Sequence, residues 1–180
     1  NRRTEQGFEL AIREFQSAID KEPAYAQAYT GLADSYLLTA SYGWVPPKVF
    51  MPKAREAALR AIELNEGLAE AHTSLAAIAQ NYDWDWATAE KEYRRAIQLN
   101  PSYATAHHWL GADLGNQKRF DESLVELRRA EELDPLSPII STNVGDTLVF
   151  ARRYDEAIAE YKRVLISNPD FPYAHLALSD

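Results

Sequence analysis

Four histidines are the side chains in this sequence most suited to metal binding or acid–base catalysis. No two of them lie four residues apart, which is the spacing that a zinc site on one helix uses. His72, His107 and His175 occupy one position in different copies of a repeated segment, where another copy has Tyr29. A position that recurs in this way indicates a structural role. His108 falls outside that position and is the one histidine that we expect to contact a ligand.

Asp83 and Asp85 have the spacing that opens a calcium-binding loop, but the glycine of the sharp turn and the distal glutamate are both missing. The chain also has no glycine-rich phosphate loop, no nucleophile elbow and no two-histidine zinc helix. Three dibasic pairs alternate with acidic residues, which favours solvated ion pairs over phosphate contacts. These pairs are Arg94-Arg95, Arg128-Arg129 and Arg152-Arg153. The sequence therefore predicts a protein that is not an enzyme and has no cofactor and no metal.

The composition narrows the class of partner. The 180 residues include 19 Lys and Arg against 27 Asp and Glu, and the net charge of −8 argues against nucleic acid and anionic membranes as partners. The chain has no cysteine and therefore no disulfide or thiol site. It also has no apolar run long enough to span a membrane. We expect an acidic, soluble protein, located in the cytoplasm.

One six-residue sequence motif occurs five times along the chain. Its copies are AIDKEP (18–23), AIELNE (61–66), AIQLNP (96–101), AEELDP (130–135) and VLISNP (164–169). Their last residues step by 43, 35, 34 and 34 positions. Each unit has two parts with apolar residues at helical spacing, and it lacks the period-two stretches that are typical of strands. The sequence therefore predicts pairs of helices joined by turns.

This unit resembles the tetratricopeptide repeat, and the resemblance covers nearly the whole chain. Two columns of the second helices carry it: Ala11, Ala54, Ala89, Ser123 and Ala157, and then Phe15, Ala58, Tyr93, Leu127 and Tyr161. Helix axes about 8–10 Å apart need small residues where they cross, so we expect Gly111 and Ala157 at such crossings. The resemblance implies an all-α fold of antiparallel helix-turn-helix repeats stacked in a right-handed alpha-alpha superhelix.

The register of the repeat predicts the organisation of the chain. We expect one array, in which residues 1–25 are the second helix of a truncated repeat and residues 172–180 begin another. The complete repeats between them are 26–68, 69–103, 104–137 and 138–171.

The first complete repeat carries an insertion between its helices, in the segment TASYGWVPPKVFMPK (39–53). We expect Gly43, Pro46, Pro47 and Pro52 to interrupt helix there. The apolar side chains of this loop, Trp44 and Phe50 among them, either fold back over the edge of the repeat or contact a partner. Folding back is the favoured interpretation, because exposed aromatic surface is costly.

The next repeat has one extra residue at its turn, in YDWDW (82–86). Trp86 takes the position of Phe120 and Tyr154 in later repeats, and we expect it in the core. This aromatic turn, together with segments such as YRRAIQLNPSYATAHHWL, is similar to the tetratricopeptide portion of bacterial multidomain signalling and transcriptional regulatory proteins. That resemblance implies a regulatory part of a larger bacterial protein.

In the tetratricopeptide family the first helices line a concave groove that binds a peptide or a partner helix. The resemblance places on this groove Thr30, Asp34, Leu37, Leu38, Thr73, Asn81, His108, Asn116, Ile139, Thr142, Asp146, Val149 and Phe150. None of these residues is Lys or Arg, whereas family members that clamp a carboxylate tail use Lys, Asn and Arg, so we reject that ligand. Apolar residues gather at both ends of the groove, and Phe150 is the favoured anchor.

Two classes of function remain open. The first is a scaffold that binds a protein or peptide with hydrophobic anchors in the groove. The alternative is a structural spacer or a self-association module that stacks through its truncated ends. The resemblance favours the scaffold.

Overall fold

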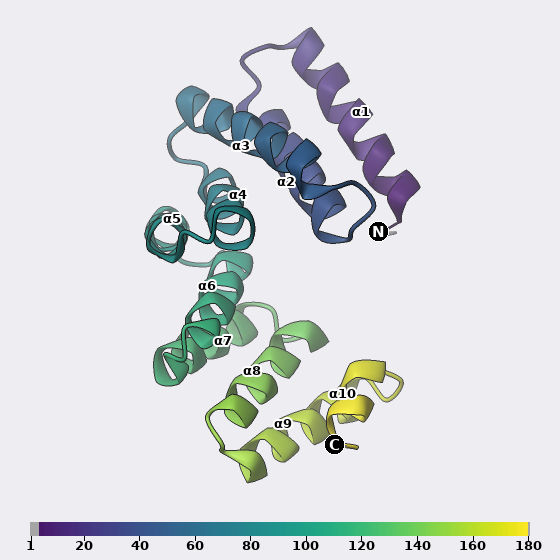
Figure 1. Cartoon of the computed structure of the whole chain (residues 1–180), viewed down its shortest axis with the longest axis vertical. Helices are drawn as coiled ribbons and strands as arrows, with labels where there is room; N and C mark the ends of the chain where they lie inside the picture. Colours follow the sequence, from purple (N-terminus) through teal and green to yellow (C-terminus); the bar gives the residue numbers. More distant parts are fainter. Residues whose placement is uncertain (1–3, 180) are drawn as a thin grey trace. The chain divides into compact units, whose positions relative to one another are not determined.

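The computed structural model describes residues 4–179, and every regular element among them is a helix (Figure 1). In chain order the elements are α1 (Glu5–Lys21), α2 (Ala26–Ser41), α3 (Pro47–Leu64), α4 (Ala69–Ile78), the π-helical turn η1 (Ala79–Asp83), α5 (Trp86–Leu99), α6 (Ala104–Asn116), α7 (Phe120–Leu133), α8 (Pro138–Phe150), α9 (Tyr154–Ser167) and α10 (Pro172–Ala177). The all-helical fold class predicted from the repeats is confirmed. Within residues 4–179 no helix is both long and apolar enough to cross a membrane.

The chain divides into two compact units, unit 1 (Asn1–Pro101) and unit 2 (Ser102–Asp180). In unit 1, α2 packs on α3, and α4 packs on α5; in unit 2, α6 packs on α7, and α8 packs on α9. Each of these pairs joins a first helix to a second helix through a turn, as the repeats predict. Two further helices pack on the pairs, because α1 contacts α2 and α10 contacts α9. By sequence register α1 is a second helix and α10 is a first helix.

Three of the turns between a first and a second helix share a backbone feature. Trp84, Lys118 and Arg152 each stand two residues before a second helix and have φ angles of 60°, 64° and 61°. This left-handed conformation ends the preceding helix and redirects the chain. Acidic residues then fill the first turns of α7 and α9, where the positive end of the helix dipole favours them.

The insertion of the first complete repeat is mostly helical, which corrects the expectation of a long loop. Helix α2 continues to Ser41 and α3 begins at Pro47, so only residues 42–46 leave the helices. Pro47 is the first residue of α3, where a missing N–H costs nothing. Pro52 lies inside α3, near its start, and the helix continues through it. The insertion therefore lengthens both helices instead of interrupting them.

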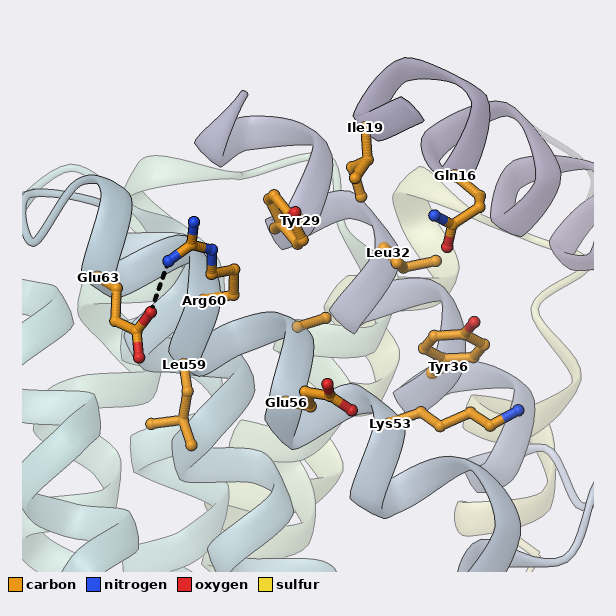
Figure 2. A pocket seen from close by; sticks show the side chains of 11 residues that line it. Gln16, Ile19, Tyr29, Leu32, Tyr36, Lys53, Glu56, Leu59, Arg60 and Glu63 are labelled. Atoms are coloured by element: carbon orange, nitrogen blue, oxygen red, sulfur yellow. Dashed lines mark hydrogen bonds and ion pairs between the residues drawn. The ribbon is translucent and has the colours of Figure 1, made fainter. Parts of the chain in front are cut away.

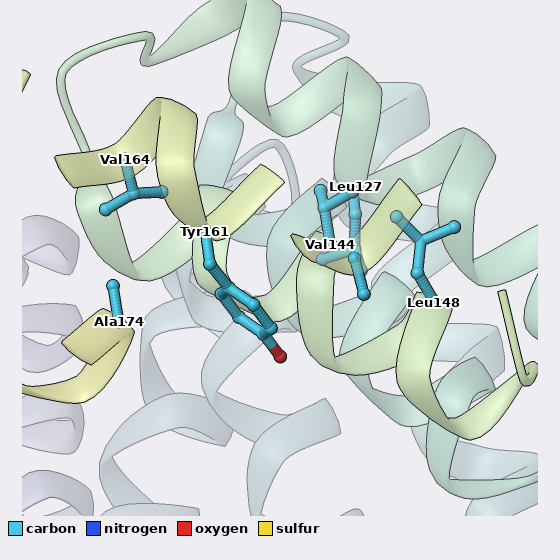
Figure 3. Close-up of a cluster of buried hydrophobic side chains, with 7 residues drawn as sticks. Leu127, Val144, Leu148, Tyr161, Val164 and Ala174 are labelled. Carbon is cyan, nitrogen blue, oxygen red and sulfur yellow. The ribbon is translucent and has the colours of Figure 1, made fainter. Parts of the chain in front are cut away.

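Seven buried side chains form the core of unit 2: Leu127, Val144, Leu148, Ala157, Tyr161, Val164 and Ala174 (Figure 3). Tyr161 lies between Val164 and Ala174 on one side and Leu127 and Val144 on the other. A Cβ atom built on Gly145 would lie 2.5 Å from the Tyr161 ring, so only glycine admits this tyrosine. A small residue on a first helix thus faces a large residue of the second-helix column, as the sequence columns predict.

The core of unit 1 is built mainly from alanine and larger aliphatic side chains: Ile19, Ala28, Leu32, Ala33, Ala57 and Ala58. The ring of Phe15 packs against this cluster and covers Gly31, whose added Cβ would lie 2.3 Å from the ring. Helices α1, α2 and α3 all contribute to this cluster, so the arrangement of these three helices is fixed by one core.

Candidate protein-binding surface

The first helices of unit 2 are joined by side-chain hydrogen bonds. Between α6 and α8, Asn143 and His108 are linked through Nδ2 and Nε2 at 2.7 Å. Between α8 and α10, the Tyr173 hydroxyl donates to Asp146 Oδ2 at 2.9 Å. Because each bond joins neighbouring first helices, α6, α8 and α10 present one connected surface.

The predicted ligand contact, His108, is half-buried on this surface. Burial lowers the pKa of its imidazole to about 4, so the ring is neutral at neutral pH. A neutral ring can accept the Asn143 amide hydrogen at Nε2. The structure therefore gives His108 a partner within the fold, between α6 and α8.

Asp146 connects three helices. Its Oδ1 accepts a hydrogen bond from the Tyr161 hydroxyl of α9 at 2.5 Å, and its Oδ2 accepts from Tyr173 of α10. Burial, together with the Asp146 carboxylate, raises the pKa of the Tyr161 phenol well above its usual range. Both carboxylate oxygens are thus engaged, so Asp146 positions α8 against its neighbours.

Apolar side chains lie exposed along α8. Ile139 is 41% exposed, Val149 is 37% exposed and Phe150 is 68% exposed. Ile139, Asp146 and Phe150 lie on one side of the helix, since their spacings of seven and four residues are close to whole turns, and Val149 lies beside Phe150. Phe150 adds a large aromatic side chain at the last residue of α8. We call Ile139, Val149 and Phe150 the α8 patch.

No Lys or Arg stands on any of the five first helices, α2, α4, α6, α8 and α10. The predicted lack of positive charge on these helices therefore holds over their whole described length. Because the first helices carry no cation that could pair with a carboxylate, the surface that they form favours an apolar side chain over an acidic one.

Several other residues predicted for the groove are packed into the units. Leu37 is 3% exposed, so its side chain belongs to the interior of unit 1 and cannot anchor a partner. The hydroxyls of Thr30, Thr73 and Thr142 are buried and donate to backbone carbonyls of their own helices. Leu38 is half-buried, and outside the α8 patch only Asn81 and Asn116 of the predicted groove residues are exposed.

Asp34, also predicted for the groove, accepts a hydrogen bond from Ser74 Oγ of α4 at 2.5 Å. Burial raises the pKa of this carboxyl to about 6, and the nearby Glu70 charge adds to the increase, while the Ser74 bond opposes it. Asp34 therefore joins α2 to α4 within unit 1 at an electrostatic cost.

The recurring histidine position is a point of contact with the second helix. His72 Nδ1 lies 2.7 Å from Glu92 Oε2, and His107 Nδ1 lies 2.6 Å from Glu126 Oε2. The two pairs are equivalent in successive repeats. His175 instead bonds the Pro169 carbonyl at 2.6 Å. These contacts support the structural role that the repeat position predicts.

The two aspartates with calcium-loop spacing hold helix ends. Asp85 caps α5, because its carboxylate accepts from the Thr88 backbone N–H at 3.1 Å and from the Thr88 hydroxyl at 2.7 Å. Asp83 forms an ion pair with Arg55 of α3. Both carboxylates are therefore occupied by protein partners.

Replacing Asp85 with alanine should lower the free energy of unfolding of unit 1, because the first turn of α5 loses its cap. Urea denaturation followed by circular dichroism measures this change. Added calcium should shift neither the native protein nor the variant, and a calcium-dependent increase in the stability of the native protein alone would contradict the capping role.

The predicted loop contacts pack against neighbouring rings. Trp44 stacks on Tyr42 with ring centroids 4.9 Å apart and also contacts Phe8 of α1 at 5.5 Å. Phe50 meets Tyr36 edge-on at 4.8 Å. Both side chains thus lie over the edge of the repeat, in the arrangement that the sequence favours.

Sequence reasoning did not single out Trp84, which is 70% exposed. The extra residue of this repeat is accommodated as η1, and Trp84 follows it with a left-handed backbone. Its ring packs on Trp86 at 6.1 Å, and Trp86 is half-buried rather than fully in the core. The one-residue insertion was the available signal for this projecting side chain.

Comparisons with known proteins agree with the repeat. Residues 85–118 match a family model described as TPR repeat, and residues 143–180 match one described as tetratricopeptide repeat. No curated protein matches the chain significantly. The tetratricopeptide repeat is therefore supported by these two segments, one of which spans the α5–α6 region and the other the region from α8 to α10.

Solved structures show the same fold. TTC0263, a thermophilic TPR protein of Thermus thermophilus, is 19% identical, with a TM-score of 0.77 over 96% of this chain and 89% of that chain. YrrB, described as a TPR protein with an unusual peptide-binding site, is 20% identical, with a TM-score of 0.68 over 97% and 85% of the two chains. PilF of Pseudomonas aeruginosa is 24% identical, with a TM-score of 0.72 over 86% and 66%. The chain has the fold of tetratricopeptide arrays.

Proposed function

We propose that this chain is a protein-binding scaffold rather than an enzyme, and that the α8 patch of unit 2 receives an apolar anchor of its partner. The observation that carries the proposal is the 68% exposure of Phe150 on a surface made of first helices. Burying such a side chain contributes about 1.5–3 kcal/mol. The description of YrrB as a peptide-binding TPR protein supports the same class of function.

The scaffold is preorganised, which favours binding of a flexible segment. Hydrogen bonds from Asn143 to His108 and from Tyr173 to Asp146 hold α6, α8 and α10 together before a partner arrives. Binding then orders only the partner, and less conformational entropy is lost. A partner segment with apolar side chains, and without a requirement for a carboxylate, fits this surface.

Phe150→Glu should lower the retention of the partner at least tenfold in affinity capture from a lysate of the source organism, since a buried aromatic anchor is worth about that factor or more. Val125→Glu is the matched control, because Val125 is also 68% exposed but lies on the second helix α7. Circular dichroism checks that both variants fold. Equal retention by the native chain and Phe150→Glu would reject the α8 patch as the binding surface.

The alternative is self-association, and it is favoured by exposed apolar residues of α9 and α10. Ile166 is 82% exposed and Leu176 is 60% exposed. In this case copies of the chain would associate through these helices, and Leu176→Glu would abolish the association while Phe150→Glu would not. Sedimentation velocity at increasing concentration distinguishes the two functions. The cytoplasmic location and the regulatory context in a larger bacterial protein stay predictions.

A further inference from the structure

Unit 1 contains a cleft of about 680 Å³ between two second helices, α1 and α3. Its apolar floor is formed by Ile19 of α1 and by Tyr29, Leu32 and Tyr36, which share one face of α2 at helical spacing (Figure 2). The volume lies in the range of sites that enclose several side chains of a ligand. The cleft is separate from the α8 patch, which belongs to unit 2.

Comparison of equivalent positions explains why this cleft is open. In unit 2 the second helices α7 and α9 are joined by two ion pairs, Arg128 with Glu160 and Glu131 with Arg163. The repeat register places Gln16, Ile19, Ala57 and Arg60 of unit 1 at the positions of Arg128, Glu131, Glu160 and Arg163. All four line the cleft.

Three of the four bridging charges are therefore missing from unit 1. Among residues 4–179 no ion pair or hydrogen bond joins α1 to α3. In unit 2 the two ion pairs cross the space between α7 and α9 at these positions. The open cleft in unit 1 thus follows from the replacement of charged bridges by Gln16, Ile19 and Ala57.

Of the charged side chains that line the cleft, the two cations interact with neighbouring side chains, whereas one carboxylate does not form a hydrogen bond or an ion pair. Lys53 Nζ lies over the rings of Tyr36 and Phe50, 5.8 and 5.4 Å from their centroids. Arg60 forms an ion pair with Glu63 at 2.8 Å. The carboxylate of Glu56, which stands in the middle of the α3 wall, forms no hydrogen bond or ion pair with any described residue. The cleft therefore offers one acidic group to a ligand, and both of its cations are engaged.

We propose that this cleft is a second binding site, which takes a short segment of a partner protein that carries Lys or Arg between apolar side chains. The cation pairs with Glu56 and lies near the faces of Tyr29 and Tyr36, where aromatic rings attract positive charge. The apolar side chains pack on Ile19 and Leu32. An acidic segment is rejected, because it would place a second carboxylate beside Glu56.

A library of random heptapeptides displayed on phage tests this proposal, with the whole chain as the target. Selection should enrich Lys or Arg flanked by apolar residues. Synthetic peptides from the selection should bind at least tenfold more weakly to Gln16→Arg/Ala57→Glu, which rebuilds the Arg128–Glu160 bridge across the cleft with no change in net charge. Because the bridge copies a pair that unit 2 already contains, this variant is expected to fold, and circular dichroism checks it.

A second selection isolates the role of Glu56. Against Glu56→Gln the enrichment of Lys and Arg should disappear while the apolar preference remains, and Phe150→Glu should bind the original peptides as the native chain does. The proposal is overturned if no sequence is enriched, if the peptides bind the bridged variant unchanged, or if Phe150→Glu abolishes their binding. The last outcome would assign the peptides to the α8 patch and would leave the scaffold function intact.

Discussion

Replacing Gly111 with leucine is expected to lower the free energy of unfolding of unit 2 by about 3 kcal/mol, at the upper end of the usual cost of overpacking. Gly111 is buried on α6, where this helix crosses α7. A Cβ atom there would lie 2.7 Å from Leu127 Cγ and 3.1 Å from the Leu127 backbone nitrogen. A side chain can rotate away from such a contact, but the backbone can yield only if α7 moves as a whole.

Ala159→Leu is the control for this substitution, because it adds a similar volume to the exposed side of α9. Its free energy of unfolding should stay within about 0.5 kcal/mol of the native value. Ala157→Leu, at a 1% exposed position of the same helix, should resemble Gly111→Leu in direction. Urea denaturation followed by circular dichroism gives all three values. Equal midpoints for Gly111→Leu and Ala159→Leu would show that the crossing is not at Gly111.

The helix pairs could be predicted from the sequence because the residues that pack the two helices of a repeat recur at the same positions in several repeats. Gly111 and Gly145 stand in one first-helix column, and Leu127 and Tyr161 stand in one second-helix column. In the structure each glycine lies under the large residue of its own repeat. Packing of this kind depends only on positions within one repeat, so a single sequence contains it.

The candidate surface was predicted less completely, because exposure depends on neighbouring repeats. Leu37 and Phe150 were both assigned to the groove, but Leu37 is buried and Phe150 is exposed. The hydrogen bond from Tyr173 to Asp146 joins helices of adjacent repeats, and no position within one repeat predicts it. The sequence pattern locates a face of a helix, whereas packing between repeats decides which residues of that face stay accessible.

The cleft between α1 and α3 could not be predicted from the sequence either, because it also depends on contacts between repeats. Gln16, Ile19 and Ala57 are ordinary residues when taken singly. They open a cleft only because the equivalent residues of unit 2 form ion pairs between α7 and α9, and the structure was needed to show those pairs.

The effect of Pro52 was also predicted incorrectly. Pro52 was expected to interrupt the helix, but α3 continues through it, since packing of the buried Met51 and Ala54 holds this part of the helix in place.

Asp34→Asn is expected to raise the free energy of unfolding of unit 1 by about 2 kcal/mol at pH 7.5. The carboxyl has a pKa of about 6 in the folded protein, against 3.8 for the same group in its ordinary environment, because burial penalises its charge. A difference of this size is worth at most about 3 kcal/mol. Asparagine removes the buried charge and its repulsion from Glu70, and it keeps the oxygen that accepts from Ser74.

The sign of the pH dependence follows from proton uptake. Asp34 binds its proton more tightly in the folded state, so its contribution to stability is fully present below about pH 4 and is lost as the pH rises through about 6. The native chain and Asp34→Asn should therefore have similar stability near pH 4 and should diverge as the pH increases. Urea denaturation at several pH values, followed by tryptophan fluorescence, measures this, since three of the four tryptophans (Trp44, Trp84 and Trp86) lie in unit 1.

His108 provides the opposite dependence in unit 2 and so serves as an internal control. Its folded pKa of about 4 lies below the ordinary value of 6.5, so its contribution to stability is present above about pH 6.5 and is lost as the pH falls towards 4. In a chain that retains Trp109 of unit 2 as its only tryptophan, fluorescence reports the unfolding of unit 2. In that chain Asp34→Asn should not change the loss of stability of unit 2 as the pH falls towards 4. If the variant instead gained the same stability at pH 4 as at pH 7.5, the effect would come from the amide and not from removal of a buried charge.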